Sequence, residues 1–196
     1  MTDDREQFRK AKQGEGIIVR ADLAIAERAD KYSDTIPVRV VGKLSELADQ
    51  PPLIAASLTT ALVGYAWQRP TIVRLGLRML ASHDLAMALK SVVKNNIDRT
   101  RPDKTADEGE HEAQPGHSDE GEDRSFPSGH SAGAVAIARA IAREQPSAAR
   151  IVYPAAAIAS GIQIPRKAHF TSDVLVGVAI GFVAELIIDR MSRRWL

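Results

Sequence analysis

The chain has 196 residues, of which 26 are lysine or arginine and 25 are aspartate or glutamate, so its formal net charge is +1. This balance excludes the strong positive field typical of nucleic-acid-binding proteins, and the length suffices for one domain, residues 1–196, with a full core. The sequence contains no cysteine, which excludes disulfides, thiol catalysis and cysteine-ligated metals.

The first 36 residues are polar and are predicted to form one amphipathic helix at a surface or interface. Apolar residues recur at helical spacing from Ile17 to Tyr32, among many charges. The segment Met1–Lys12 is charged and lacks the apolar core of a signal peptide, so we expect no cleaved export signal.

An uncharged stretch from Gln50 to Gln68 has the length of a bilayer crossing, for which about 20 residues are needed. Tyr65 and Trp67 lie near one end and Arg69 follows them, which is the pattern of an interfacial belt. The serine and threonines within the stretch leave a buried helix of a soluble protein as the alternative.

A second long helix is predicted from Thr71 to Asp98, where apolar residues alternate with ionisable ones. Because lipid-exposed helices rarely carry ionisable groups, this helix should pack inside a bundle. Further helices are expected over Ser131–Arg143, Ile151–Pro165 and Val174–Ile188. No useful period-two pattern occurs, so the predicted fold class is all-α, a membrane-embedded bundle of about five or six helices.

The segment Asp103–Asp123 contains nine acidic residues and one lysine. Such a composition is typical of a solvated segment, and we predict a mobile acidic loop inserted at residues 103–124. His111 and His117 could bind a metal together with the acids, but their spacing matches no compact ligand set. We therefore predict no metal site and no cofactor.

Three polar clusters interrupt the apolar helices, and the first runs from Lys94 to Pro102. Lys94 and Arg101 are seven residues apart, about two turns, and would share a face if the helix continued to Pro102. A lysine together with an arginine fork can hold a phosphate. Basic residues at a helix C-terminus are also common because of the helix dipole, which is the alternative explanation.

The second cluster is Pro127-Ser128-Gly129-His130, directly before an apolar run. Backbone amides at a helix start form an anion site, and a histidine beside it can transfer a proton. The third cluster contains His169 and Asp173, which can meet across one helical turn. A carboxylate that fixes the histidine tautomer leaves the other ring nitrogen as a nucleophile. Taken singly, these two clusters are better explained as an ordinary helix cap and a structural polar pair.

Taken together and in this order, the three clusters resemble the signature of the type 2 phosphatidic acid phosphatase superfamily. That superfamily also includes bacterial acid phosphatases and vanadium haloperoxidases. The resemblance covers Gln50 to Ile188 and implies a helical bundle core with a metal-independent phosphatase site.

The resemblance also assigns roles to individual residues. His169 would attack phosphorus and form a phosphohistidine, and Asp173 would orient it. His130 would protonate the leaving alkoxide and later activate water. The non-bridging oxygens of the phosphate would be held by Lys94, Arg101, Ser128 and Gly129.

One position departs from the family pattern. The third cluster of the family normally begins with an arginine six residues before the nucleophilic histidine, and Gln163 stands at that position here. We predict that Arg166 replaces the missing arginine in phosphate binding. The alternatives are weakened phosphate binding or a different substrate.

The expected function is hydrolysis of a phosphate monoester or diphosphate of a lipid through a phosphohistidine, with the membrane as partner and no nucleic acid. The alternatives are a vanadate-dependent haloperoxidase and a catalytically weakened anion-binding membrane protein. The expected location is the bacterial inner membrane. One helix, Val174–Ile188, separates the third cluster from the C-terminal arginines, so the site should face away from the cytoplasm.

Overall fold

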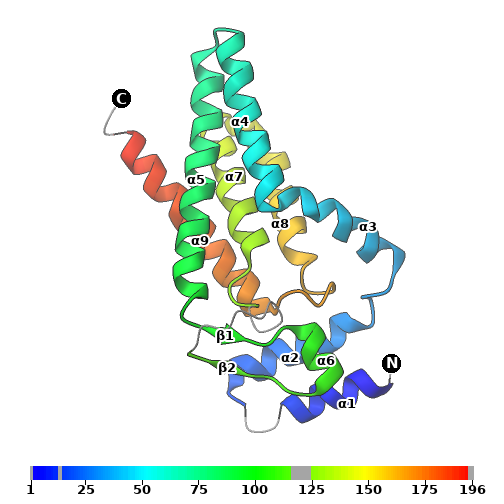
Figure 1. The fold of residues 1–196 in the computed structure, drawn as a ribbon. Helices are drawn as coiled ribbons and strands as arrows, with labels where there is room; N and C mark the ends of the chain where they lie inside the picture. The colour runs from blue at the N-terminus through cyan, green and yellow to red at the C-terminus, as the bar shows by residue number, and fades with distance from the viewer. Residues whose placement is uncertain (1, 13–14, 116–124, 194–196) are drawn as a thin grey trace.

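The structure, a computed structural model, describes residues 2–12, 15–115 and 125–193. Within these residues the chain forms nine α-helices, two short 3-10 helices and one two-residue antiparallel strand pair (Figure 1). The all-α prediction is therefore confirmed.

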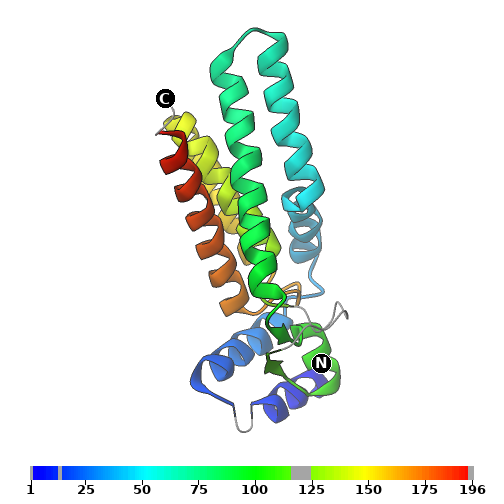
Figure 2. The same ribbon diagram turned by 60° about the vertical axis from the view of Figure 1, so that its left-hand side comes forward.

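A bundle of five helices makes up most of the molecule (Figures 1 and 2). Its members are α4 (Gln50–Ala66), α5 (Pro70–Lys94), α7 (Gly129–Glu144), α8 (Ala149–Gly161) and α9 (Thr171–Ser192). Helix α7 packs against α5, α8 and α9, and α4 pairs with α5 as a helical hairpin. Alanines of α7 dominate its core contacts, so the neighbouring helices can approach its axis closely.

A close backbone approach brings the start of α9 against the start of α7. A side chain at Gly177 would collide with the carbonyl oxygen of Ser128, and one at Gly181 would collide with the carbonyl of Ala132. Since both neighbours are backbone atoms, the two helices touch through their main chains. This contact fixes the second polar cluster beside the third.

A smaller polar layer covers one end of the bundle (Figure 1). It consists of α1 (Thr2–Ala11), α2 (Ile17–Asp30), α6 (Pro102–Glu108) and the antiparallel pair of β1 (Asp98–Arg99) with β2 (Ala113–Gln114). Phe8, Leu23 and Ala106 are almost fully buried here, and they pack around Phe170 from the loop that precedes α9. The layer is thus attached to the bundle at the third polar cluster.

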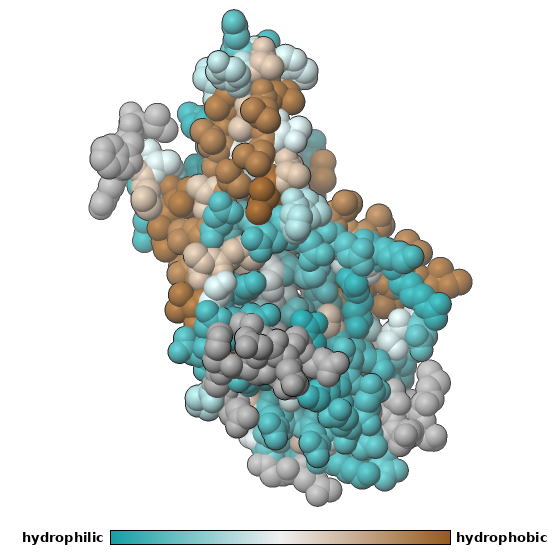
Figure 3. All heavy atoms as spheres, viewed as in Figure 1, coloured by the Kyte–Doolittle hydropathy of each residue, from teal (hydrophilic) through white to brown (hydrophobic). Residues whose placement is uncertain are grey.

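Helix α3 (Ile36–Ser45) continues into the 3-10 turn η1 (Glu46–Ala48) and projects sideways from the bundle (Figure 1). Its exposed apolar side chains recur at helical spacing: Ile36, Val40, Leu44 and Leu47. Figure 3 shows apolar surface over the bundle away from the polar layer, and hydrophilic surface over that layer. On this face of the molecule (Figure 3) the apolar surface thus lies over the bundle and is separate from the hydrophilic surface of the polar layer.

Three predictions on the chain's elements need correction. Residues 1–36 contain two helices, α1 and α2, and the start of a third rather than one helix. Helix α5 ends at Lys94 instead of Asp98, because the chain then turns into β1. Pro102 does not follow a helix but begins α6, since proline at the first helical position needs no hydrogen-bonded N–H.

The acidic segment is also more ordered than its composition suggested. Asp103 lies in the first turn of α6, where the helix dipole favours a negative charge. Gly109 ends the helix in the left-handed conformation with a φ of 74°, and β2 follows. The loop prediction is thus wrong for residues 103–108 and 113–114, and its part at residues 116–124 lies outside the described residues.

Helix α9 is the one helix of the described chain whose length and composition suit a membrane crossing. Only 33% of its most apolar window is buried inside the molecule, so most residues of that window reach the surface at least in part. The predicted crossing at Gln50–Gln68 forms a helix of 17 residues, α4, which is shorter than expected.

We predict that Gly177→Ala weakens the α7–α9 contact. The added methyl meets a backbone carbonyl that cannot move aside, so the free energy of unfolding should fall by about 1–3 kcal/mol. Gly161→Ala is the matched control, because a Cβ at that helical position has no neighbour within 4 Å. Thermal unfolding of both purified variants checks this, and equal midpoints would contradict the close backbone contact.

Candidate active site

A polar cavity of about 210 Å³ lies where the bundle meets the polar layer. Five of the eight predicted site residues line it, although they come from distant parts of the chain. The lining residues are Ala48, Asp49, Gln50, His83, Met87, Lys90, Lys94, Arg101, Pro127, Gly129, His130 and His169. All three polar clusters therefore contribute to one cavity.

The cations of the cavity come from two elements. Lys90 and Lys94 are one turn apart at the end of α5, and Arg101 precedes α6 in an extended conformation. Since α5 ends at Lys94, the predicted shared helix face does not exist, and a reversal of the chain brings Arg101 back to the cavity. The sequence analysis missed Lys90, although its i,i+4 spacing to Lys94 places both on one face.

The backbone of Gly129 lies directly beside the Lys90 side chain. A Cβ there would lie 3.4 Å from Lys90 Cδ and 3.6 Å from its Nζ. Gly129 and His130 open α7, so their N–H groups belong to the first turn, which has no intrahelical acceptors. The cavity thus combines lysine side chains with a helix N-terminus, both of which attract anions.

Ser128 lies behind this wall and is fully buried. Its Oγ accepts hydrogen bonds from Ser131 N at 3.4 Å and Ser131 Oγ at 3.0 Å, which caps α7. Its own N–H donates to the carbonyl of Asp173 at 3.0 Å. Ser128 therefore holds the turn in place and does not line the cavity.

The hydrogen bond of His169 defines its tautomer. Nδ1 lies 2.7 Å from the carbonyl oxygen of Ser125, in a buried contact. A carbonyl can only accept, so Nδ1 carries the proton and Nε2 keeps its lone pair in the neutral ring. His169 is therefore prepared to act as a nucleophile at Nε2.

Asp173 reaches His169 less directly than expected. Its Oδ2 is 3.9 Å from His169 Nδ1, beyond hydrogen-bond distance, and accepts instead from the Phe170 N–H at 2.8 Å. That bond caps α9 at the residue next to His169. Asp173 thus positions His169 through the backbone and through its charge, while the direct partner is the Ser125 carbonyl.

Arg99, which the sequence analysis missed, connects the cavity to the polar layer. Its Nη1 donates to Asp173 Oδ1 at 2.6 Å and to Ser172 Oγ at 2.7 Å. Its Nη2 donates to Asp22 Oδ2 at 2.8 Å, and the guanidinium lies 4.4 Å from the centre of the Phe170 ring. Arg99, Asp22 and Asp173 are all buried, so this is a buried charge network next to His169.

Asp22 ties helix α2 to the start of α9. Its Oδ1 accepts from the Ser172 N–H at 3.0 Å, and its Oδ2 accepts from the Ser172 hydroxyl. These contacts join residues 150 positions apart, and no local pattern in the sequence marks them.

His111 completes the network on the side of the polar layer. Arg99 Nε donates to His111 Nε2 at 3.3 Å, so the ring is neutral and its Nδ1 faces Glu15 Oε1 at 3.2 Å. Burial lowers the pKa of His111; the contact with Glu15 opposes this shift and the charge of Arg99 reinforces it. His111 is thus a structural partner of Arg99.

His130 faces Asp49 across the cavity. The distance from His130 Nε2 to Asp49 Oδ1 is 2.9 Å, and Asp49 is the residue that precedes α4. The charge of Asp49 favours the protonated imidazole, which is the form that donates a proton, whereas burial and the neighbouring His169 oppose it. His83, at the cavity wall on α5, is fully buried, and its Nε2 has no partner among the described residues.

Neither Gln163 nor Arg166 lines the cavity. Gln163 is buried and its side-chain Nε2 donates to the Ala159 carbonyl at 3.0 Å, while its backbone carbonyl accepts from the His169 N–H. Arg166 Nη1 donates to the Gly42 carbonyl and to Ser45 Oγ, both at 2.9 Å. The predicted replacement by Arg166 therefore has no support in this geometry, because α3 holds its guanidinium in a neighbouring hollow.

Among the described residues, no group of three histidine or acidic side chains is arranged to hold a metal ion. His111 is occupied by Arg99 and Glu15. His117, the other histidine considered as a ligand, lies outside the described residues.

We predict that Asp22→Asn lowers the free energy of unfolding by about 3 kcal/mol, because it removes one charge of a buried pair. Glu27→Gln on the same helix is the control. Its ion pair with Lys12 is about one-quarter exposed on both sides and should contribute about 1 kcal/mol or less. Chemical unfolding of both variants checks this, and an equal loss would contradict the network.

The lowered pKa of His111 predicts a pH dependence of stability. The unfolded histidine takes up a proton below a pH of about 6.5, whereas the folded one resists it until lower pH. Stability is therefore complete above this pH and declines as the pH falls, by up to about 1.4 kcal/mol per pH unit. His111→Gln should flatten this part of the profile, as thermal unfolding between pH 5 and 7.5 would show; parallel profiles would refute it.

The comparisons with known proteins identify the fold and the family. In the search of curated protein sequences, none matched the chain. A Bacillus subtilis structure, described as a transmembrane PAP2 type phosphatidylglycerolphosphate phosphatase, aligns with a TM-score of 0.67 at 20% identity, covering 99% of this chain and 98% of that one.

The structure of Aquifex aeolicus LpxE aligns with a TM-score of 0.60 at 20% identity, covering 86% of this chain and 94% of that one. At this identity the two likenesses establish the fold. The family model described as the PAP2 superfamily matches residues 75–195, which is more than half of the chain and contains every cavity residue from Met87 to His169. The chain belongs to the PAP2 superfamily.

Proposed function

We propose that this protein is a phosphatase that hydrolyses a phosphate monoester or diphosphate of a lipid, and that a phosphohistidine forms on His169. The observation that carries the proposal is the convergence of His169, His130 and three basic residues on one cavity. The hydrogen bond from His169 Nδ1 to Ser125 supports the nucleophilic role, because it leaves the Nε2 lone pair available.

The proposed reaction has two steps. His169 Nε2 attacks phosphorus, the bond from phosphorus to the leaving oxygen breaks, and His130 transfers its proton to that oxygen. His130 then accepts a proton from water, which attacks the phosphorus of the phosphohistidine. The nitrogen–phosphorus bond breaks, inorganic phosphate leaves and His169 is regenerated.

Charge stabilisation in this cavity comes from side chains and from the backbone. The phosphoryl oxygens gain negative charge in the transition state, and positioned cations and N–H groups offset it. The cations are Lys94 and Arg101, and the N–H groups are those at the start of α7, at Gly129. These are the groups that the family resemblance implied. We assign the place of the family's missing third-cluster arginine to Lys90, which lines the cavity where Arg166 does not.

The apolar surface supports a lipid as substrate. The exposed stripe of α3 and the exposed face of α9 form two surfaces suited to lipid contact. We place the bundle in the bilayer, the polar layer in water and the cavity at the boundary between them (Figure 3). The Bacillus subtilis neighbour is itself described as acting on a lipid phosphate.

The arginines at the other end of the bundle support an orientation. Arg74 and Arg78 on the first half of α5, Arg143 near the end of α7 and Arg193 just after α9 lie together at that end, away from the cavity. Arginine-rich margins lie on the cytoplasmic side of membranes. We therefore propose a bacterial inner membrane location with the cavity facing away from the cytoplasm.

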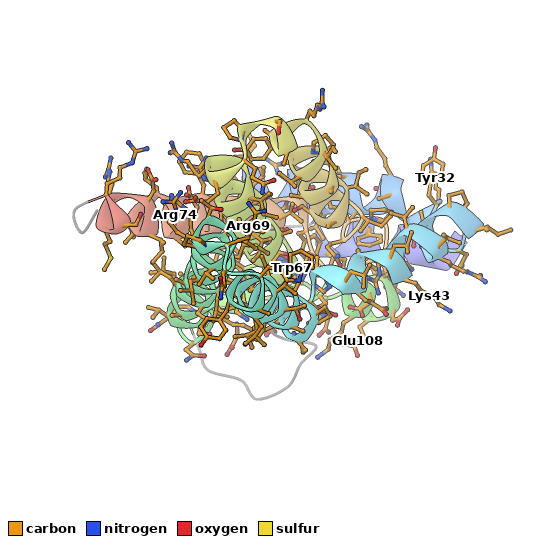
Figure 4. The ribbon with its side chains drawn as sticks, turned by 90° about the horizontal axis from the view of Figure 1, so that it is seen from above. Tyr32, Lys43, Trp67, Arg69, Arg74 and Glu108 are labelled. Carbon is orange, nitrogen blue, oxygen red and sulfur yellow. The ribbon has the colours of Figure 1, made fainter. Side chains whose placement is uncertain are left out.

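We predict that His169→Ala abolishes turnover and that Lys90→Met lowers it by about 10²-fold, because one donor to the phosphoryl group is lost. Lys43→Met is the control, since Lys43 lies exposed on α3 (Figure 4). Phosphate release from phosphatidate, phosphatidylglycerophosphate, isoprenyl diphosphate and lipid A is measured with and without a chelator.

Activity that persists with the chelator and disappears in His169→Ala is the expected result. Full activity of His169→Ala would refute the nucleophile. Phosphate binding without release of product would instead favour the weakened anion-binding protein.

A further inference from the structure

A second and larger hollow lies at the end of the bundle opposite the active-site cavity. Its volume is about 730 Å³, and it lies between the first half of α5 and the last half of α9, with the end of α7 beside them. The lining residues are Pro70, Val73, Arg74, Leu77, Arg78, Ala81, Arg143, Glu144, Ile188, Asp189, Ser192 and Arg193. None of them lines the active-site cavity.

A buried ion-pair cluster forms the inner side of this hollow. Arg78 donates to Glu185 at 2.7 Å, to Asp189 at 2.5 Å and to Glu144 at 3.2 Å. Arg139 joins through Glu185 at 3.0 Å. The Nε of Arg78 is buried and has no hydrogen-bond partner among the described residues, so this cluster retains an unused donor.

The outer side of the hollow carries three more arginines, and these are much more exposed. Side-chain exposure is 52% for Arg74, 38% for Arg143 and 68% for Arg193. Arg143 makes only long contacts, 3.8 Å to Glu185 and 3.6 Å to Asp189. The cluster therefore has five guanidinium groups and three carboxylates, and its net charge of +2 lies toward the opening.

The remaining wall is apolar. Val73, Leu77 and Ala81 follow one face of α5, and Ile188 faces them from α9. Leu77 is 54% exposed although it lies within the bundle helix. A ligand that fills this space needs an anionic group for the arginines and a hydrocarbon part for this wall.

The position of the hollow supports a lipid as that ligand. Trp67 and Arg69 mark this end of the bundle (Figure 4), and Tyr65 and Trp67 are 79% and 69% exposed. Exposed aromatic residues beside arginines are typical of a membrane–water boundary, and anionic lipid head groups lie at that depth.

We propose that this hollow is a binding site for an anionic phospholipid. The phosphate group lies among Arg74, Arg143 and Arg193, and the first part of an acyl chain lies against Leu77 and Ile188. The proposal rests on the membrane placement given above and is independent of phosphatase chemistry. The bound lipid offsets part of the surplus charge and fills the gap between α5 and α9.

The test uses the full chain in neutral detergent and counts bound lipid by native mass spectrometry. Phosphatidylglycerol is the probe, because it has no phosphate monoester to hydrolyse, and phosphatidylcholine is the neutral comparison. The double variant Arg74→Gln/Arg143→Gln brings the cluster to a net charge of zero. At roughly 1 kcal/mol per basic residue near the membrane surface, it should bind phosphatidylglycerol about 30-fold more weakly.

Two control variants separate this site from others. Arg150→Gln removes an exposed arginine of α8 outside the hollow, and Lys94→Met alters the active-site cavity. Both should bind phosphatidylglycerol like the original protein. If the double variant does not fold, Arg143→Gln alone loses only long ion pairs and should weaken binding about fivefold.

Equal binding by the double variant and Arg150→Gln would overturn the proposal, as would equal binding of phosphatidylcholine. If inorganic phosphate displaces the lipid, the hollow binds a free anion and the lipid proposal is wrong. Loss of binding only in Lys94→Met would assign the lipid to the active-site cavity. Because none of these measurements needs turnover, a protein without phosphatase activity can still confirm the lipid site.

Discussion

The arrangement of the candidate active site depends on one buried interaction, the pairing of Arg99 with Asp173 and Asp22. Three buried charges would each be costly alone, and breaking such a pair leaves an uncompensated charge inside the protein. The pairing therefore fixes three elements at once: β1 through Arg99, the start of α9 through Asp173, and α2 through Asp22. His169 lies in the loop that these elements hold, and its geometry follows from theirs.

This constraint explains why the polar layer belongs to the site. Phe170, next to His169, is buried among side chains of α1, α2 and α6, and its ring lies under the Arg99 guanidinium. The carbonyl of Ser125 is set by a second contact, since the Ser125 N–H donates to the Arg99 carbonyl at 3.0 Å. Arg99 thus contributes to both sides of His169: its backbone holds the hydrogen-bond acceptor of the ring, and its side chain holds the helix that follows. The catalytic proposal therefore involves residues that need never touch the substrate.

Much of the fold and part of the site could be predicted from the sequence. Helical spacing and the absence of period-two patterns predicted the all-α bundle. The order of the polar clusters predicted five residues that the structure brings together: Lys94, Arg101, Gly129, His130 and His169.

Arg99 and Asp22 could not be predicted, because their partners are 74 to 150 residues away and leave no local spacing pattern in the sequence. The loop prediction for the acidic segment failed because its composition indicates only that the segment is hydrated on average. A single proline at the start and a single glycine at the end are enough to define helix α6 within it. The i+4 spacing of Asp173 suggested a direct hydrogen bond to His169. In the structure His169 donates to the Ser125 carbonyl, and Asp173 accepts from the Phe170 N–H.

The central claim is that the phosphoryl group is transferred to His169 Nε2, and trapping the phosphohistidine tests it most directly. The protein is mixed with a radiolabelled lipid phosphate, quenched within the first turnover, and examined for label bound to the polypeptide. The account predicts label that is stable in alkali and released by acid, as expected of a phosphoramidate, located at His169 by peptide mapping and absent from His169→Ala. His130→Ala should still capture label from a substrate with a good leaving group, because it lacks the acid but retains the nucleophile. Label on another residue, or turnover without any covalent label, would contradict the account.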